Sequence, residues 1–301
     1  ASTYQLVVAE SRGRYHGVRA AFARVRLAEA KKPLEERAAL LAETIATHPD
    51  SGLVRPHLRR LLESLDDAHG PEASQRWLDA LRPRVPGSAA EQVIDYERAE
   101  RLAKLGKLAE ARDAYVRLAR AHPYPSGALT DDAYHHAAQL ELELGRPREA
   151  VTLLEEMLAP REPAHFGGSY ERPRFPEARL RLGLLHAGAL GDRERGKRAL
   201  RRLHDAHPHS RLVDDALWLE ARLEAEDGRS DRACQALATL ERARPSSRYL
   251  PCSSAVCESA PKRGGRPCPA YLERELAEPA LGAAAARITR SAPTDEDTDR
   301  D

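Results

Sequence analysis

Proline and glycine recur along this sequence at an almost constant interval. Pro49, Pro86 and Pro123 follow one another every 37 residues, and Pro208 and Pro245 are again 37 residues apart. Proline cannot continue an α-helix, and glycine is the residue that most often ends one. A fixed interval between such residues therefore predicts a chain of similar helical units.

Each unit contains one further break, which divides it into two helices. The break glycines Gly106 and Gly145 are 39 residues apart, and Gly191 and Gly228 are 37 residues apart. A hairpin of two helices buries only one face of each, so the units are expected to stack on one another. Apolar residues on both sides of Gly228 have helical spacing: Leu217, Leu219, Ala221, Leu223, Ala233, Ala236, Leu237 and Leu240.

A small residue follows each break by five positions, and a larger one follows four positions later. The small residues are Ser74, Ala111, Ala150, Gly196 and Ala233, and the larger ones are Leu78, Tyr115, Leu154, Leu200 and Leu237. With the downstream proline, the G-x-x-x-x-A pattern beginning at Gly106, Gly145 and Gly228 resembles the tetratricopeptide repeat. This resemblance covers about residues 35–249 and implies an all-α, right-handed superhelical solenoid of about six helix hairpins. Arg37 in the first hairpin and Gly196 in the fifth depart from the pattern.

The junctions between units carry a second resemblance. The sequences HPDSGL, HPHSRLVDDAL and RPSSRYL resemble the P-x-S-x-x-x-x-D-A junctions of bacterial envelope repeat proteins. These include the outer-membrane assembly lipoprotein of the BamD/YfiO type and the periplasmic accessory protein of the Tol-Pal system. The resemblance implies a non-enzymatic scaffold that binds envelope proteins or an extended peptide. Such a scaffold would lie in the periplasm or at the outer membrane, held there peripherally or by a lipid anchor. The alternatives are a cytoplasmic regulatory scaffold and an enzyme whose catalytic groups meet only in three dimensions.

Changes in composition divide the chain into five parts. We expect an N-terminal helical segment in residues 1–30 and the solenoid in residues 31–249, interrupted by an insertion at 160–176. A Cys/Pro/Gly-rich loop at 250–269 precedes a capping helix at 270–290, which could run from Ala270 to Ile288. Residues 291–301 form an acidic tail without apolar residues able to pack, which predicts disorder.

The first helices of such a solenoid line a concave groove on which a partner polypeptide can lie. Aromatic and arginine side chains contribute most at protein interfaces. The repeat register places six candidate partner-binding residues on this face: Tyr96, Glu100, His135, Gln139, Trp218 and Arg222. Trp218 could equally pack between hairpins. Carboxylates interleaved with arginines, as in Glu97 and Arg101, are typical of a solvated helix face.

The insertion at 160–176 contains four prolines and two consecutive glycines, which forbid a helix there. It nevertheless contains two of the three phenylalanines of the chain. Aromatic and arginine residues in a surface loop indicate either a contact site for another protein or a loop folded back on the solenoid. The candidate contact residues are Phe166, Tyr170, Arg172 and Phe175.

The four cysteines, Cys234, Cys252, Cys257 and Cys268, lie at the end of the repeats. Their even number and the Gly/Pro/Ser-rich loop that holds three of them favour two disulfides in an oxidising compartment. We expect one disulfide within the loop, either Cys252–Cys257 or Cys257–Cys268. Free thiols in a reducing cytoplasm and a zinc site are the alternatives, the latter weakened by the lack of a C-x-x-C motif.

Charge and motifs argue against several other functions. The net charge of +1 provides no field to hold nucleic acid or an anionic membrane. No uncharged apolar run of about 18 residues could span a bilayer. Signature motifs for nucleotide, metal-protease or serine-hydrolase sites are missing, and we expect no cofactor and no metal. His204, His207 and His209 could share a metal but fit solvated junction residues better. The sequence starts at Ala1, which fits a processed or trimmed N-terminus.

Overall fold

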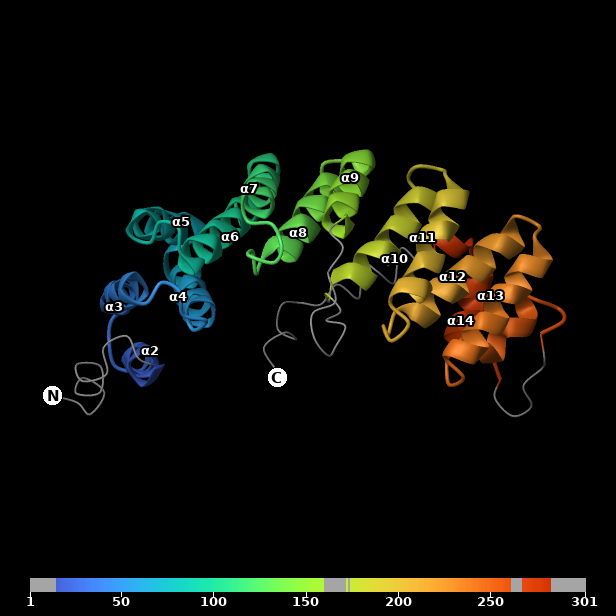
Figure 1. Cartoon of the computed structure of the whole chain (residues 1–301), viewed down its shortest axis with the longest axis horizontal. Coiled ribbons are helices and arrows are strands. Elements are labelled where there is room, and N and C mark those ends of the chain that lie inside the picture. Colours follow the sequence, from blue (N-terminus) through green and yellow to red (C-terminus); the bar gives the residue numbers. More distant parts are fainter. Residues whose placement is uncertain (1–14, 160–171, 173, 261–266, 283–301) are drawn as a thin grey trace. The chain divides into compact units, whose positions relative to one another are not determined.

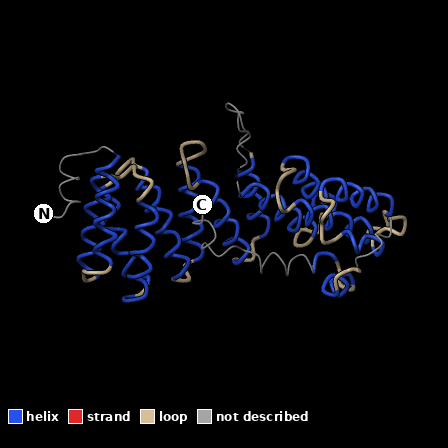
Figure 2. The backbone as a smooth tube through the Cα atoms, turned by 90° about the horizontal axis from the view of Figure 1, so that it is seen from below, coloured by secondary structure: helices blue, strands red, loops and turns tan. Residues whose placement is uncertain are grey.

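In the computed structural model of the protein, residues 15–159, 172, 174–260 and 267–282 are described (Figure 1). All regular elements in these ranges are helices, as the tube in Figure 2 also shows. The chain divides into two compact units, residues 1–160 and 161–301. Unit 1 contains α2 (Tyr15–Glu29), α3 (Leu34–Thr47), α4 (Val54–His69), α5 (Pro71–Leu81), η1 (Arg82–Arg84), α6 (Ala89–Lys104), α7 (Leu108–Ala121), α8 (Thr130–Glu143) and α9 (Pro147–Leu158). Unit 2 contains α10 (Arg174–Ala187), α11 (Arg193–Ala206), α12 (Val213–Glu226), α13 (Ser230–Ala243), η2 (Leu250–Ala255) and α14 (Ala270–Leu276).

The helices from α2 to α13 form six consecutive hairpins in the described part of the chain, which confirms the predicted all-α repeat fold. The bends lie at the predicted glycines. Gly106, Gly145 and Gly228 have φ values of 74°, 74° and 73°, a left-handed conformation that a residue with a Cβ adopts at a cost. The residue after each of these glycines donates its N–H to the carbonyl five residues earlier, as in the Schellman motif. These glycines therefore end the first helix of each hairpin.

In every hairpin but the first, which has Arg37 there, the two helices cross at the predicted small residue. Ser74, Ala111, Ala150 and Ala233 are completely buried, and the larger residue four positions later is buried in every hairpin. At Gly196 the crossing is tighter than an alanine allows. A Cβ there would lie 2.6 Å from the Ala187 Cβ and 2.8 Å from the Gly183 carbonyl oxygen. Gly196 is therefore a variant of the small position that brings α11 closer to α10.

The proline junctions contact one another from one repeat to the next. The Ala90 N–H donates to the Pro49 carbonyl at 2.9 Å, and the Asp50 carboxylate accepts from the Ala89 N–H at 2.9 Å. In unit 2 the Arg244 guanidinium donates to the Pro208 carbonyl at 2.7 Å. These bonds satisfy backbone groups that the prolines leave outside the helices.

The N-terminal side of α10 differs from the prediction. The sequence excluded a helix from the whole insertion at 160–176, but α10 begins at Arg174 and includes Phe175 and Pro176. Proline is compatible with the first turn of a helix, where its missing N–H has no helical partner. Residues 160–171 and 173 lie outside the described part of the structure.

Two disulfides connect the end of the solenoid to the loop that follows it. Cys234 on α13 pairs with Cys257, and Cys252 in η2 pairs with Cys268. The expected number of disulfides and the presence of one within the loop agree with the structure, but both predicted pairings were wrong. Cys257 instead reaches back to the last repeat helix, which leaves Cys252 and Cys268 to each other.

Helix α14 is shorter than the predicted capping helix from Ala270 to Ile288. It ends at Leu276, and Pro279 interrupts the chain before a new helical turn begins at Ala280. Leu272 and Ala280 are buried in the hydrophobic core of unit 2. Residues 283–301, and with them the predicted acidic tail, lie outside the described residues.

Candidate functional site

Tyr96 lies on α6, where three other helices of unit 1 surround it. Its ring centroid is 5.2 Å from that of Tyr115 on α7 and 5.8 Å from that of His136 on α8. The Arg55 guanidinium of α4 lies over the Tyr96 ring, 5.3 Å from its centroid, and 3.9 Å from the carboxylate of Asp132 on α8. Only 2% of Tyr96 is exposed, so it packs among these helices and is not available to a partner. The side chains of Arg55 and Asp132 remain partly exposed.

The other three groove candidates of unit 1 differ in their exposure. His135 is buried beside His136, whereas Glu100 and Gln139 are partly exposed. The Gln139 amide lies 3.5 Å from the carboxylate of Glu143, an exposed residue one helical turn further along α8. Of these candidates, Glu100 and Gln139 therefore offer polar groups at the surface of the first helices.

Glu97 and Arg101 were interpreted above as part of a solvated helix face, and this interpretation was wrong. Both side chains are buried, and the Arg101 guanidinium lies 2.5 Å from the Glu97 carboxylate and 3.4 Å from that of Asp66 on α4. Burial, together with the negative charge of Glu100, raises the pKa of Glu97 to about 7. The i,i+4 spacing alone could not reveal this, because it is the same for exposed and buried pairs.

Trp218 of α12 packs inside unit 2 rather than facing a partner. Its ring stacks on that of Tyr249, with centroids 5.1 Å apart and an interplanar angle of 11°. Only 2% of Trp218 is exposed. The Tyr249 hydroxyl donates to the carboxylate of Asp215, near the start of α12. Trp218 is therefore buried against the residues that follow α13.

Arg222, one turn further along α12, contacts the polypeptide backbone of the C-terminal segment, which we define as residues 269–282. Its guanidinium donates to the carbonyl of Glu278. The carboxylate of Glu226, four residues later, accepts the N–H of Ala280 at 2.6 Å. Both backbone groups lie beside Pro279, where the helical hydrogen bonds are interrupted. This face of α12 therefore holds a stretch of polypeptide through its main chain.

Of the candidates in the insertion, Phe166 and Tyr170 lie outside the described residues. Arg172 and Phe175 are buried, and the Arg172 guanidinium lies over the Phe175 ring, 4.2 Å from its centroid. The Phe175 ring also approaches the His207 ring, at 6.3 Å between centroids. These two side chains therefore attach the end of the insertion to unit 2, and the contact role of the insertion stays a prediction.

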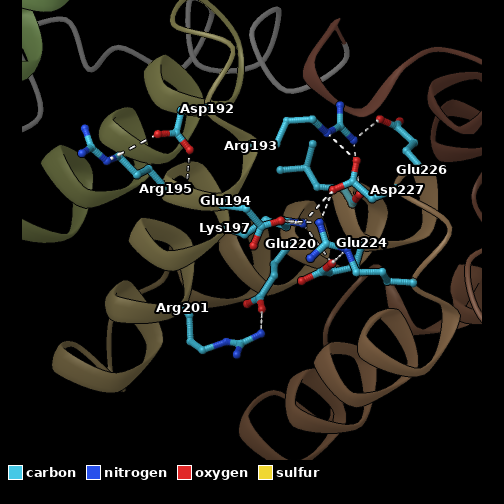
Figure 3. A network of polar contacts seen from close by, with 12 residues as sticks. Asp192, Arg193, Glu194, Arg195, Lys197, Arg201, Glu220, Glu224, Glu226 and Asp227 are labelled. Carbon is cyan, nitrogen blue, oxygen red and sulfur yellow. Dashed lines mark hydrogen bonds and ion pairs between the residues drawn. The ribbon is translucent and has the colours of Figure 1, made fainter.

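A network of charged side chains joins α11 to α12 and to the bend that follows (Figure 3). The Lys197 ammonium is 3% exposed and lies 2.8, 3.0 and 2.7 Å from the carboxylates of Glu194, Glu224 and Asp227. The Arg229 guanidinium contacts the same three carboxylates. Hydrogen bonds from Arg229 and Lys197 lower the pKa of Glu194 to about 2. Every charge has a partner, which suits a structural clamp better than a catalytic site.

The same clamp occurs in unit 1 at the same repeat positions. Arg112 follows the small residue Ala111 as Lys197 follows Gly196, and it lies 2.7 Å from the buried carboxylate of Glu141. Arg146, directly after the bend, lies 3.8 Å from that carboxylate. The clamp is therefore a feature of the repeat, which the apolar pattern of the sequence did not reveal.

No cluster of three or more His, Cys, Asp or Glu side chains is arranged to hold a metal ion within the described residues. The junction histidines have other contacts, since the Arg179 guanidinium donates to His207 at 3.2 Å and His204 lies 3.0 Å from the Asp205 carboxylate. No described helix combines the length and apolarity required to cross a membrane.

The described hairpins, five of which have a small residue at the crossing, define a helical-repeat protein. Residues 177–210, which comprise most of the fifth hairpin, match the tetratricopeptide repeat family. These residues are thus similar to a tetratricopeptide repeat. The matched hairpin is the one with Gly196, so its departure from the usual small residue does not exclude it from the repeat. Comparison with curated proteins gives no match.

Several solved structures are similar to this chain, among them the following three. YrrB, described as a TPR protein with an unusual peptide-binding site, is 15% identical, with a TM-score of 0.40 over 69% of this chain and 94% of its own. A MamA RS-1 ArsTM double mutant is 16% identical, with a TM-score of 0.42 over 64% of this chain and 95% of its own. The APC/C hetero-tetramer Cut9–Hcn1 is 12% identical, with a TM-score of 0.37 over 96% of this chain and 56% of its own.

Proposed function

We propose that this protein is a non-enzymatic scaffold that holds segments of partner proteins against its first helices. One observation carries this proposal. Arg222 and Glu226 of α12 bind a carbonyl and an N–H of the C-terminal segment, and neither contact depends on the identity of the bound side chains. A first helix of this chain is therefore built to hold polypeptide, and a segment of another protein offers the same groups.

Unit 1 has a related pair at the same register. Gln139 and Glu143 precede the bend at Gly145 by six and two residues, as Arg222 and Glu226 precede Gly228. The Gln139 amide can donate to a carbonyl, and the Glu143 carboxylate can accept an N–H. Both side chains have exposed surface, whereas Arg222 is 5% exposed beneath the C-terminal segment. We therefore assign the docking of a partner segment on unit 1 to Gln139 and Glu143, and we add Glu100 of α6, which precedes Gly106 by the same six residues.

We place this scaffold in an oxidising compartment, and specifically in the bacterial envelope. Two disulfides that use all four cysteines support the first part, because disulfides persist in the periplasm and are rare in the cytosol. The junction sequences support the second part through their resemblance to envelope repeat proteins. The proposed partners are envelope proteins, and the proposed role is assembly or maintenance of the envelope.

Photo-crosslinking in the native cell tests the docking site. Gln139 is replaced by p-benzoylphenylalanine, and the matched control carries the same replacement at Gln75, whose amide lies 3.4 Å from Asp79 one turn along the second helix α5. We expect position 139 to form an adduct with another protein that position 75 does not form. Equal adducts, or no adduct at position 139, would contradict the proposal.

Alkylation of cysteines in intact cells tests the compartment. All four cysteines are expected to react with a thiol reagent only after reduction. Alkylation without reduction would show free thiols and would favour the cytoplasmic alternative.

A further inference from the structure

The C-terminal segment occupies, on unit 2, the kind of surface that the proposed function assigns to a partner. It begins at Pro269, directly after Cys268, and forms α14 before the break at Pro279. Leu272 is completely buried and Ala280 is 1% exposed, while Leu276 and Leu281 pack partly buried against the same core. These four apolar residues are the side chains by which the segment is held.

The polar contacts of the segment recognise a break between two helical turns. Arg222 takes a carbonyl that lies after the end of α14, and Glu226 takes the N–H of the first residue of the next turn. A proline between two helical turns leaves such groups without helical partners. The surface of α12 therefore suits a short amphipathic helix that ends before a proline, followed by a new turn with a small apolar residue.

The segment depends on its tether to stay in place. A helix of seven residues such as α14 has little stability in isolation, because helix nucleation is unfavourable. Cys252 and Cys268 fix the residue before the segment to η2, and Cys234 and Cys257 fix the chain just after η2 to α13. The chain already makes binding of the segment intramolecular, and the Cys252–Cys268 disulfide shortens the link, which raises the effective concentration of the segment further.

We propose that the C-terminal segment is an internal competitor for a second docking surface on unit 2, and that the Cys252–Cys268 disulfide sustains this competition. The proposal rests on the proposed scaffold function. The partner is a protein segment of the kind just described, an amphipathic helix interrupted by proline. When a dithiol reductant transfers two electrons and two protons to the disulfide, Cys252 and Cys268 become thiols and the reductant becomes a disulfide. The segment then remains attached only through the chain that follows Cys257, its effective concentration at the surface falls, and the partner displaces it.

A labelled peptide with the sequence of residues 269–282 serves as the probe, and its fluorescence anisotropy is measured against the full chain. We expect the peptide to bind the variant C252S/C268S at least ten-fold more tightly than the oxidised wild type. The variant C234S/C257S keeps the Cys252–Cys268 tether and is the matched control, expected to bind like the wild type. In a W77F background, a thermal melt followed by Trp218 fluorescence verifies that unit 2 is folded.

Two further variants locate the binding surface. Adding R222A and E226A to C252S/C268S should weaken peptide binding at least ten-fold. Adding Ala280→Arg instead should displace the attached segment, because Ala280 is buried. This triple variant should bind the peptide more tightly still. A peptide carrying Leu272→Asp should not bind, because this leucine is completely buried in the segment.

Equal affinity of the oxidised wild type and C252S/C268S would overturn the proposal, as would failure of the Ala280→Arg variant to bind. Dimerisation of C252S/C268S in gel filtration would also overturn it, because two copies would then exchange their segments instead of yielding the surface. The crosslink at position 139 concerns unit 1 alone. Its failure would contradict the scaffold function, whereas a crosslink there with no peptide binding would contradict only the internal competition.

Discussion

Replacing Lys197 by methionine tests whether the clamp of unit 2 stabilises the fold. The methionine retains most of the volume and removes the charge, which leaves the carboxylate of Glu224, 3% exposed, with Arg229 as its remaining cation at 3.3 Å. Removing one partner of a buried ion pair costs about 3–5 kcal/mol. Because Arg193 and Arg229 still neutralise Asp227, we expect the lower end, a loss of about 3 kcal/mol.

Urea unfolding measures this loss in a W77F background, in which Trp218 is the only tryptophan and reports on unit 2. The matched control is Arg195→Met, which removes an exposed pair 3.4 Å from Asp192 and should cost less than about 0.5 kcal/mol. The double variant K197M/E224Q should recover part of the loss, because it removes the carboxylate left without Lys197. A loss below about 1 kcal/mol for K197M, or an equal loss for both single variants, would refute the structural role of the clamp.

Three further changes have defined outcomes. Gly196→Ala should lower the free energy of unfolding by about 1–2 kcal/mol in the same urea titration, because overpacking outweighs the helix propensity gained. The control Gly52→Ala, which has open space around it, should be close to neutral. Arg112→Met should destabilise unit 1 by about 2–3 kcal/mol, measured by Trp77 fluorescence in a W218F background, because Glu141 keeps only Arg146 at 3.8 Å. Burial raises the pKa of Glu97 from 4.5 to about 7, so its contribution to stability is complete below about pH 4.5 and is lost as the pH rises through 7. The loss in the free energy of unfolding should approach about 3 kcal/mol by about pH 8 and be absent in Glu97→Gln. An equal pH dependence of both proteins would contradict the raised pKa.

The fold could be predicted from the sequence because its signals are local. A bend glycine such as Gly106 and a small residue such as Ala111 act within one hairpin, and both lie where the pattern placed them. Local spacing is thus sufficient to identify a repeat whose contacts are mostly between neighbours.

The site was less predictable because its contacts are not local. Arg222 meets Glu278, 56 positions later, and no periodicity connects these residues. The disulfides depend in the same way on the path of the loop, which composition does not determine. The helical register placed Tyr96 on the face of the first helices that lines the groove. Its burial, however, depends on Tyr115 and His136 from two other helices.

The clamp at Lys197 also affects the order in which unit 2 comes apart. In a stack of hairpins, stability is roughly the sum of the stability of each hairpin and a coupling energy between neighbours. Lys197 and Arg193 of the fifth hairpin contact carboxylates of the sixth, so much of the coupling is concentrated at one interface. Under a pulling force or during heating, these two hairpins should therefore separate from each other last.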